Sequence, residues 1–162
     1  MTDQEFLELL SRHERLIYSI CTTFAKGDRE EMNDLYQEIL CTLWENRSRF
    51  RGECSGKNWL YRVGLNTAIS SWRKLTRRPT TVPLPSEMEQ WLKDDAADPL
   101  KEELYKLIDR LPKADQSLLF LYIDGNSHKE IAEIMGISER KWVTFLKERE
   151  DFATKINSTI FR

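Results

Sequence analysis

The sequence predicts an all-α protein made of two small helical domains joined by a linker. Apolar residues recur at steps of three and four through every long segment, which is the spacing of one helix face. Alternation of polar and apolar residues, which is typical of half-buried strands, is missing. Ser, Thr or Asp followed three residues later by Glu also recurs just before apolar runs, as at helix starts. Together these observations favour packed amphipathic helices throughout.

The first expected element is a single helix from Thr2 to Gly27. Thr2 and Glu5 form a capping box, and Gly27 supplies a left-handed stop without steric cost. The apolar residues between them keep helical spacing: Phe6, Leu9, Leu10, Ile17, Ile20, Cys21 and Phe24.

A second helix is expected to open at Asp28, with Glu31 three residues later. Its apolar stripe consists of Met32, Leu35, Tyr36, Ile39, Leu40, Leu43 and Trp44. On the flank of that stripe Asp34, Gln37 and Glu38 form a compact patch of carboxylates and one amide. On spacing alone, an ordinary solvated surface is the simpler interpretation of this patch.

Residues 47–78 concentrate basic charge. They contain nine Lys or Arg residues against one acid, Glu53, so their net charge is +8. Residues 1–46 carry −6 and residues 79–162 carry −4, which gives −2 for the whole chain. Because phosphate is neutralised locally, a weakly acidic protein with this distribution can bind nucleic acid.

The basic stretch begins as a loop over residues 46–58 and is expected to continue as a helix with two different faces. One face carries Trp59, Arg62, Asn66, Ser70, Arg73 and Arg77, and the other carries Leu60, Gly64, Leu65, Ala68, Trp72 and Leu75. Cations bind phosphates, an aromatic ring stacks on an unpaired base, and an amide reads a base edge. The polar face therefore suits nucleic acid. The alternative is a solvated charged face with Trp59 packed under a neighbour.

Residues 79–98 contain three of the five prolines and few periodic apolar residues, so they are expected to form a linker. The second domain, residues 99–162, starts with a helix that ends at Pro112. A further helix is expected from Lys113 to Asp124, with Gly125 as its stop. The last helix is expected to start after Ser138 and to reach about residue 157.

A helix-turn-helix is expected within this second domain. Ser127 and Glu130 form a capping box, Ala132 is small enough for a close helix crossing, and Gly136 suits the positive φ of the turn. Ile137, Trp142 and Phe145 occupy the packing positions of the second helix. The DNA-facing candidates are Ser127, His128, Lys129, Ser138, Glu139, Arg140, Lys141, Thr144 and Lys147. The alternative is a plain helical hairpin.

Several classes are excluded or disfavoured. No apolar run is long enough to span a membrane, and the start of the chain lacks the features of a signal peptide, so a cytoplasmic protein is expected. Cys21, Cys41 and Cys54 are expected to be free thiols, because their spacing fits neither a metal site nor a disulfide framework. Phosphate-binding loops and hydrolase motifs are missing, so we expect no catalytic residues, metal, cofactor or small-molecule substrate.

Taken together, the motifs resemble a family. The run DLYQEILCTLWENRSRF, followed by FRGECSGKNWLYRVGLNTAISSWRK, is similar to region 2 of bacterial extracytoplasmic-function RNA polymerase sigma factors. The later LIDRLPKADQSLLFLYIDGNSHKEIAEIMGISE is similar to region 4 of the same family. The resemblance covers most of the chain in the expected order, and it implies domains at residues 1–78 and 99–162.

The resemblance assigns roles to residues of the first domain. Asp34, Leu35, Gln37 and Glu38 match the family's DLxQE motif, which implies docking on the clamp helices of the polymerase largest subunit. The loop over residues 50–58 matches the segment that captures a flipped base of the minus-ten element. The basic charge of residues 47–78 and this resemblance together predict the following minus-ten DNA contacts: Arg49, Arg51, Lys57, Trp59, Arg62, Asn66, Arg73, Lys74 and Arg77.

Region 4 implies recognition of the minus-thirty-five element by the helix that begins after Ser138. One departure stands out, because family members usually place Lys or Arg where this chain has Val143, Phe145 and Glu148. Two or three fewer phosphate contacts predict weaker binding with a flatter salt dependence.

The main hypothesis is therefore a cytoplasmic sigma factor that binds core RNA polymerase and promoter DNA and helps open that DNA. The family also implies an anti-sigma factor as a partner, without insertion of this chain into a membrane. An alternative is a sigma-derived polymerase- or partner-binding regulator whose region 4 no longer reads DNA specifically. A stand-alone helix-turn-helix repressor fits residues 127–147 but leaves the first domain unexplained.

Overall fold

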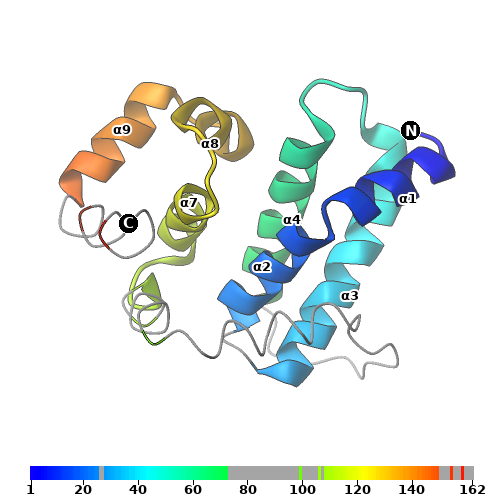
Figure 1. Ribbon diagram of the computed structural model, residues 1–162, viewed down its shortest axis with the longest axis horizontal. Helices are drawn as coiled ribbons and strands as arrows, with labels where there is room; N and C mark the ends of the chain where they lie inside the picture. Colours follow the sequence, from blue (N-terminus) through cyan, green and yellow to red (C-terminus); the bar gives the residue numbers. More distant parts are fainter. Residues whose placement is uncertain are drawn as a thin grey trace. The chain divides into compact units, whose positions relative to one another are not determined.

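The structure is a computed structural model that describes residues 1–25, 28–72, 99, 106, 108–149, 154 and 158 (Figure 1). Contacts divide the chain into two compact units, Met1–Gln90 and Trp91–Arg162. The division falls inside the expected linker at residues 79–98, which lies outside the described residues, so the exact domain bounds stay a prediction. Every regular element in the described ranges is a helix, which confirms the all-α class.

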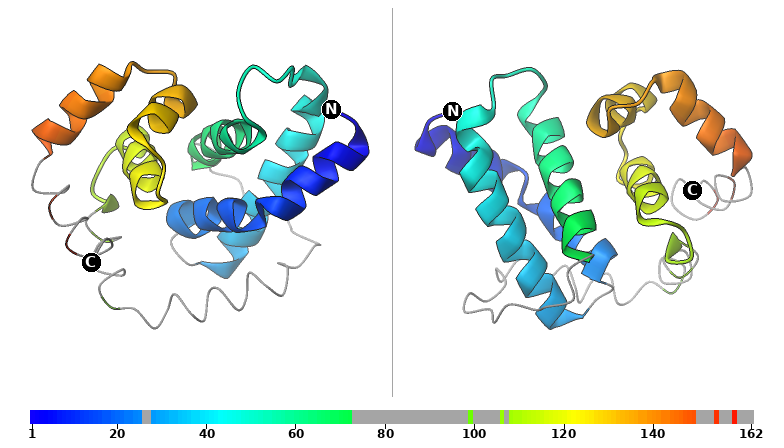
Figure 2. Two further views of the ribbon diagram at one scale, coloured as in Figure 1. Left: turned by 45° about the horizontal axis from the view of Figure 1, so that its top comes forward. Right: turned by 180° about the vertical axis from the view of Figure 1, so that it is seen from behind.

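The first unit is built on three helices, α2 (Glu14–Ala25), α3 (Arg29–Asn46) and α4 (Gly56–Trp72). Each packs against the other two, and α3 and α4 run antiparallel (Figures 1 and 2). Their largest fully buried side chains include Ile17, Tyr18, Ile20, Met32, Ile39, Leu43, Leu60 and Leu65. Gly64 permits a close approach, because a Cβ there would lie 2.7 Å from Ile20 Cδ1.

The long first helix expected from Thr2 is in fact two helices. α1 (Asp3–Arg12) ends at His13, whose φ of −120° and ψ of 26° leave the helical region, and α2 begins at Glu14. The apolar stripe lapses where it would continue after Leu10, since positions 13 and 14 hold His and Glu. The change of direction lets Phe6 stay buried against Trp44 of α3. The expected stop at Gly27 lies outside the described residues.

The expected helix starts are confirmed where they are described. The side-chain oxygens of Thr2, Asp28, Ser127 and Ser138 accept hydrogen bonds from backbone N–H groups three residues later. In the boxes at Thr2 and Ser127, the glutamate also accepts from the cap N–H group. These bonds satisfy N–H groups that a helix leaves without an internal partner.

The second unit contains α7 (Lys113–Ile123), α8 (His128–Met135) and α9 (Glu139–Glu148), and α8 packs against both neighbours. Its core includes Ile108, Leu119, Leu121, Ile131, Ile134 and Trp142. Gly136 has a φ of 67° between α8 and α9, as expected for the turn. Of the helix expected over residues 99–111, only Pro99, Lys106 and Ile108 are described as helical.

α9 is shorter than expected. It ends at Glu148, and Arg149 leaves the helical region with a φ of −118°. The Arg149 guanidinium donates to the Asp115 carboxylate at 2.8 Å and lies 4.1 Å from the centre of the Phe145 ring. The prediction that this helix runs on unbroken to residue 157 is therefore wrong at Arg149. Among the described residues, no helix is long and apolar enough to cross a membrane.

Candidate polymerase and nucleic-acid interfaces

The acidic patch lies on the middle of α3. Asp34, Gln37 and Glu38 are each half-buried, while Leu35 is only 5% exposed and belongs to the core. Leu35, expected as a contact residue, therefore supports the patch from below in this structure. The arrangement presents carboxylate and amide groups over an apolar stripe, which suits a partner with cationic and donor groups.

The loop between α3 and α4 is anchored at both ends. Arg47–Arg49 forms a short 3₁₀ helix (η1), and the Phe50 ring packs on Trp59 at 5.2 Å between ring centres. At the other end, the Ser55 side chain accepts from the Asn58 N–H group, and the Ser55 carbonyl accepts from the Trp59 N–H group. Because Ser55 caps it, α4 begins at Gly56, inside the range expected to be loop.

The exposed indole expected at Trp59 is wrong, and the alternative, Trp59 packed under a neighbour, is confirmed. Trp59 is only 8% exposed, because Phe50 folds back over it from the preceding loop. The opposite face behaves as expected where it is described, with Leu60, Gly64, Leu65 and Ala68 all buried. Burying two aromatic rings together removes a large apolar area from water. The Phe50–Trp59 contact thus fixes the base of the loop in this structure.

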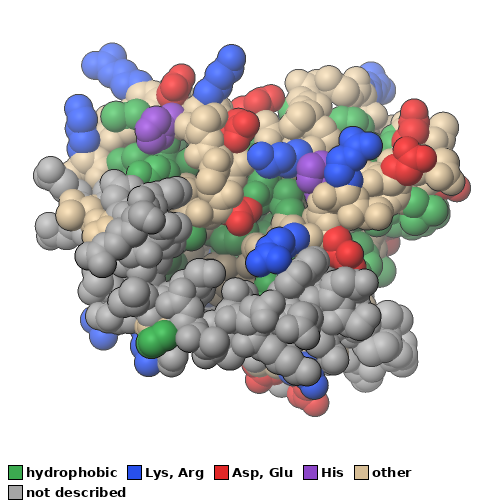
Figure 3. Space-filling view, in the orientation of Figure 1, with side chains coloured by type: hydrophobic (Ala, Val, Ile, Leu, Met, Phe, Trp, Pro, Cys, Tyr) green, Lys and Arg blue, Asp and Glu red, His purple; other side chains and the backbone are tan. Residues whose placement is uncertain are grey.

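The polar residues expected at minus-ten DNA are otherwise at the surface. Arg49, Arg51, Arg62 and Asn66 are exposed, and Lys57 is half-buried with its ammonium 5.9 Å from the centre of the Tyr61 ring. Arg73, Lys74 and Arg77 lie outside the described residues. On the face drawn in Figure 3, basic side chains protrude among acidic ones, so the described part of that face carries no unbroken basic patch.

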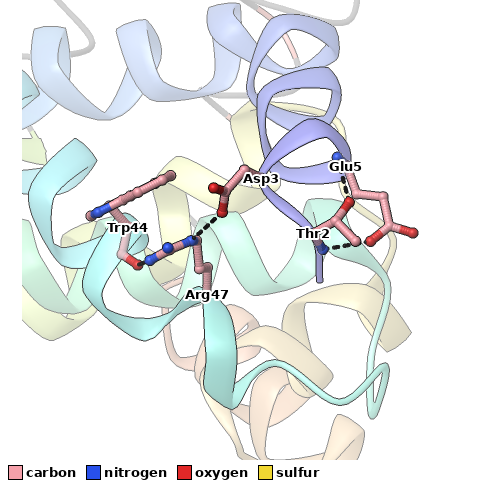
Figure 4. Close-up of polar contacts among 5 residues, drawn as sticks. All are labelled: Thr2, Asp3, Glu5, Trp44 and Arg47. Atoms are coloured by element: carbon pink, nitrogen blue, oxygen red, sulfur yellow. Dashed lines mark hydrogen bonds and ion pairs between the residues drawn. The ribbon is translucent and has the colours of Figure 1, made fainter.

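Arg47, at the start of the basic stretch, binds within the first unit. Its Nε donates to Asp3 Oδ1 at 3.1 Å, and its Nη1 donates to the Trp44 carbonyl at 2.7 Å (Figure 4). The guanidinium lies over the Trp44 ring, 3.4 Å from its centre. The same Trp44 carbonyl accepts the Arg47 backbone N–H, and a cation is favoured at the C-terminus of a helix, where α3 ends. Sequence reasoning counted Arg47 as part of a DNA-facing surface, whereas the structure uses it to hold α1 against α3.

The helix-turn-helix exposes every polar residue expected of it. Ser127, His128, Lys129, Ser138, Glu139, Arg140, Lys141, Thr144 and Lys147 are all at the surface. Three of their hydroxyls already form hydrogen bonds with the backbone. Those of Ser127 and Ser138 cap helices, and that of Thr144 donates to the Arg140 carbonyl. Of the expected packing positions, Trp142 is fully buried, and Ile137 and Phe145 are half-buried. Ala132, expected at the helix crossing, is 8% exposed.

One contact in this unit was missed from the sequence. The buried Trp142 indole N–H donates to His128 Nδ1 at 2.6 Å, and the imidazole lies nearly parallel to the Tyr122 ring. Because Nδ1 accepts, the neutral imidazole carries its proton on Nε2. No local pattern signals this bond, since its partners are 14 positions apart and meet only when the two helices cross.

The three positions where the family usually has Lys or Arg differ in their surroundings. Phe145 stacks on Trp142 at 5.7 Å and packs against the Ile108–Leu119 cluster, so it is a packing residue. Val143 is half-buried. The Glu148 side chain is 68% exposed and lies 3.9 Å from the Arg149 guanidinium. Of these three positions, only Glu148 places a negative charge on the exposed side of α9, in addition to the exposed Glu139.

Comparison with known proteins places these surfaces in a family. Residues 9–78 match the family model of sigma-70 region 2, and residues 101–141 match that of sigma-70 region 4. The ECF RNA polymerase sigma-E factor of Haemophilus influenzae is 28% identical over 141 residues, which are 78% of this chain and 74% of that protein. This chain belongs to the extracytoplasmic-function (ECF) sigma factors.

Other relatives agree. The ECF RNA polymerase sigma-E factor of Escherichia coli K12 is 26% identical over 148 residues, covering 82% of this chain and 76% of that protein. The RNA polymerase sigma-H factor of Pseudomonas aeruginosa is 25% identical over 141 residues, covering 78% of this chain and 72% of that protein. In this sigma factor, region 2 contains α2, α3, the loop and α4, while region 4 contains α7, α8 and the start of α9.

Proposed function

We propose that this ECF sigma factor binds core RNA polymerase through α3, helps open the minus-ten element with the loop and α4, and contacts the minus-thirty-five element with α8 and α9. It acts as a cytoplasmic, non-enzymatic initiation factor. The observation that carries the proposal is the position of the matched regions. Their expected polar residues lie on exposed or half-exposed surfaces of two separate helical units.

The polymerase contact is assigned to Asp34, Gln37 and Glu38. They follow one another along one side of α3, and the apolar side of that helix is fixed in the core by Met32, Ile39 and Leu43. A rigid helix presents these groups with little loss of side-chain and backbone freedom on binding. A basic, donor-rich surface of the polymerase is the complementary partner.

The minus-ten contact is assigned to the loop tip and to α4. Arg49, Arg51 and Arg62 are exposed for phosphate, and Asn66 offers an amide that can read a base edge. Trp59 takes part by holding Phe50 at the base of the loop. Its indole becomes a stacking surface only if Phe50 moves aside.

The minus-thirty-five contact is assigned to α8 and α9. Arg140, Lys141, Thr144 and Lys147 lie on the exposed side of α9, and Ser127, His128 and Lys129 lie where α8 begins. This arrangement fits a helix in the major groove with the preceding helix against the backbone. The exposed Glu148 favours the alternative role, a sigma-derived regulator whose region 4 no longer reads DNA specifically.

Association with core polymerase tests the first assignment. Asp34→Ala/Glu38→Ala is expected to weaken association by at least about tenfold, because loss of charged contacts at an interface costs about 1.4 kcal/mol or more. Glu8→Ala/Glu30→Ala is the control, since it removes the same charge from exposed positions of α1 and the first turn of α3. Equal affinity of both variants would show that polymerase docks elsewhere.

Promoter choice separates the two roles of region 4. Start sites made by core polymerase with wild-type protein are compared with those made with Arg140→Ala/Lys141→Ala. If region 4 reads DNA, the variant is expected to lose those start sites that share an upstream sequence. An unchanged set of start sites would favour the sigma-derived regulator.

Regulation by an anti-sigma factor is a further part of the proposal, and it rests on the family resemblance alone. Affinity purification of the tagged protein under non-inducing conditions checks it. A stoichiometric protein partner that prevents polymerase binding is expected. Recovery of polymerase alone under those conditions would refute regulation by an anti-sigma factor.

A further inference from the structure

One side of α1 contacts both ends of the loop at residues 50–55. Asp3, Phe6 and Leu9 follow at steps of three, so they share that side of the helix. Asp3 binds Arg47 at the start of η1, three residues before the loop. Phe6 meets the edge of Trp44 with 5.6 Å between ring centres, at the end of α3. These two contacts fix the entry to the loop.

Leu9 fixes the exit. A Cβ on Gly56 would lie 2.6 Å from Leu9 Cδ1, so the Leu9 side chain rests directly on the backbone where α4 begins. The end of α1 also lies near the start of α4. His13 ends α1, and its pKa is lowered by burial and by the charges of Arg12 and Lys57. Lys57 is the residue after Gly56 in α4.

α1 is itself held in place at its start. Thr2 and Glu5 form the reciprocal capping box drawn in Figure 4, beside the Asp3–Arg47 ion pair. Phe6 is 2% exposed and anchors the helix in the core. The loop tip has no comparable support, since Arg51, Gly52 and Glu53 are exposed and a Cβ on Gly52 would meet nothing within 4 Å.

We infer that α1 is a positioning element for the base-capturing loop, with Asp3, Phe6 and Leu9 as positioning residues that set the loop's base selectivity. The inference rests on the proposed role of the loop in capturing a minus-ten base. A loop that must discriminate between bases needs fixed ends, because a small displacement of a contacting group loses its hydrogen-bond geometry. α1 supplies those fixed ends without touching DNA.

The test compares two double variants of the full chain. Asp3→Ala/Leu9→Ala removes one contact at each end of the loop, the Arg47 ion pair at the entry and the packing on Gly56 at the exit. Gln4→Ala/Glu8→Ala is the matched control, because it changes two residues of α1 that hydrogen-bond to each other on exposed positions. Each protein is studied by amide ¹⁵N relaxation alone and then as holoenzyme with core polymerase.

The relaxation arm needs no DNA. The order parameters of residues 51–55 are expected to fall by about 0.2 in Asp3→Ala/Leu9→Ala, on a scale where about 0.85 is rigid and 0.6 flexible. They are expected to stay unchanged in the control. Wild-type order parameters in both variants would overturn the inference.

The holoenzyme arm measures binding to single-stranded minus-ten oligonucleotides with one base changed at a time. The variant is expected to lose about tenfold in discrimination at one position, the order of one base contact, with polymerase affinity unchanged. Parallel loss of polymerase affinity and discrimination would mean that α1 is merely structural. If the double variant loses amide protection throughout the first unit, the same binding measurement is made with Asp3→Asn. Its discrimination between bases is expected to fall by about twofold at most.

The two arms separate the failure of this inference from failure of the proposed function. A wild-type holoenzyme without base selectivity, together with a more mobile loop in the variant, would refute base capture and keep α1 as the positioning element. Full selectivity and an ordered loop in the variant would refute the positioning role and keep base capture.

Discussion

The two surfaces assigned to DNA differ in how far the fold itself uses their residues. In region 2, Arg47 is bound to α1 and Trp59 is covered by Phe50. In region 4, every expected polar residue stays exposed, and the buried Trp142 and the half-buried Phe145 occupy the packing positions. The region 2 surface is therefore set by contacts between separate segments of the chain. The region 4 surface follows from the spacing of one short helix pair.

The largest expected effect tests whether Trp142 is the central packing residue of the second unit. Trp142→Ala is expected to destabilise that unit by about 3–5 kcal/mol, because the residue is fully buried. Amide hydrogen exchange on the full chain is expected to show lost protection in α7, α8 and α9 only. Thr144→Ala, an exposed change on the same helix, is the control and is expected to stay within about 0.5 kcal/mol. Equal protection in both variants would contradict this packing role.

The second prediction sharpens the contrast in charge. Glu148 is exposed one helical turn after Thr144 and two turns after Lys141, so it shares the proposed DNA side of α9. Glu148→Lys is expected to tighten duplex binding by the holoenzyme and to steepen its salt dependence by about one counterion. Arg140→Gln is expected to change the slope by the same amount in the other direction. If neither variant changes the salt dependence of duplex binding, this side of α9 does not face DNA.

The third prediction concerns the Trp142–His128 hydrogen bond. Trp142→Phe keeps an aromatic ring but removes the donor, and it is expected to cost about 1 kcal/mol for the lost bond, beyond any packing change. Long-range ¹H–¹⁵N spectra report the imidazole tautomer directly. The wild type is expected to show the Nε2–H form, and the variant a mixture. A mixture already present in the wild type would mean that the indole does not fix this ring.

The smallest expected effect concerns the start of α1. Hydrogen bonds from the Thr2 backbone N–H and side chain lower the pKa of Glu5 below its ordinary value of 4.5. A carboxyl with a lowered folded pKa stabilises the helix above the unfolded pKa, and this support is lost as the pH falls through the folded value. The protection of the first-turn amides of α1, measured against their intrinsic exchange rate at each pH, is therefore expected to fall below about pH 4.5 in wild type. This fall in protection is expected to be smaller in Glu5→Gln.

Local patterns in the sequence predicted much of the fold. The caps at Thr2, Asp28, Ser127 and Ser138 and the turn at Gly136 depend on residues within four positions, so a linear reading identifies them. The packing of α1 on Trp44 through Phe6, and the bond from Arg149 to Asp115 where α9 ends, join residues that are far apart in the chain. Helical periodicity contains no information about such contacts.

The candidate site shows the same division. Exposure of the helix-turn-helix residues follows from helical spacing, whereas spacing placed Trp59 on the polar side of α4 without any sign of Phe50. The ion pair between Asp3 and Arg47 joins residues 44 positions apart, so charge counting assigned Arg47 to the DNA-facing surface. Contacts of this kind follow from how helices pack, and they appear only in the three-dimensional structure.

The most direct test of the central claim is a permanganate footprint of promoter DNA with core polymerase and this protein. Unpaired thymines are expected within the minus-ten element only when both are present. Asp34→Ala/Glu38→Ala is expected to abolish that reactivity at limiting protein, while Glu8→Ala/Glu30→Ala preserves it. Absence of polymerase-dependent melting with the wild-type protein, at every promoter recovered from its own genome, would contradict the proposed role in promoter opening.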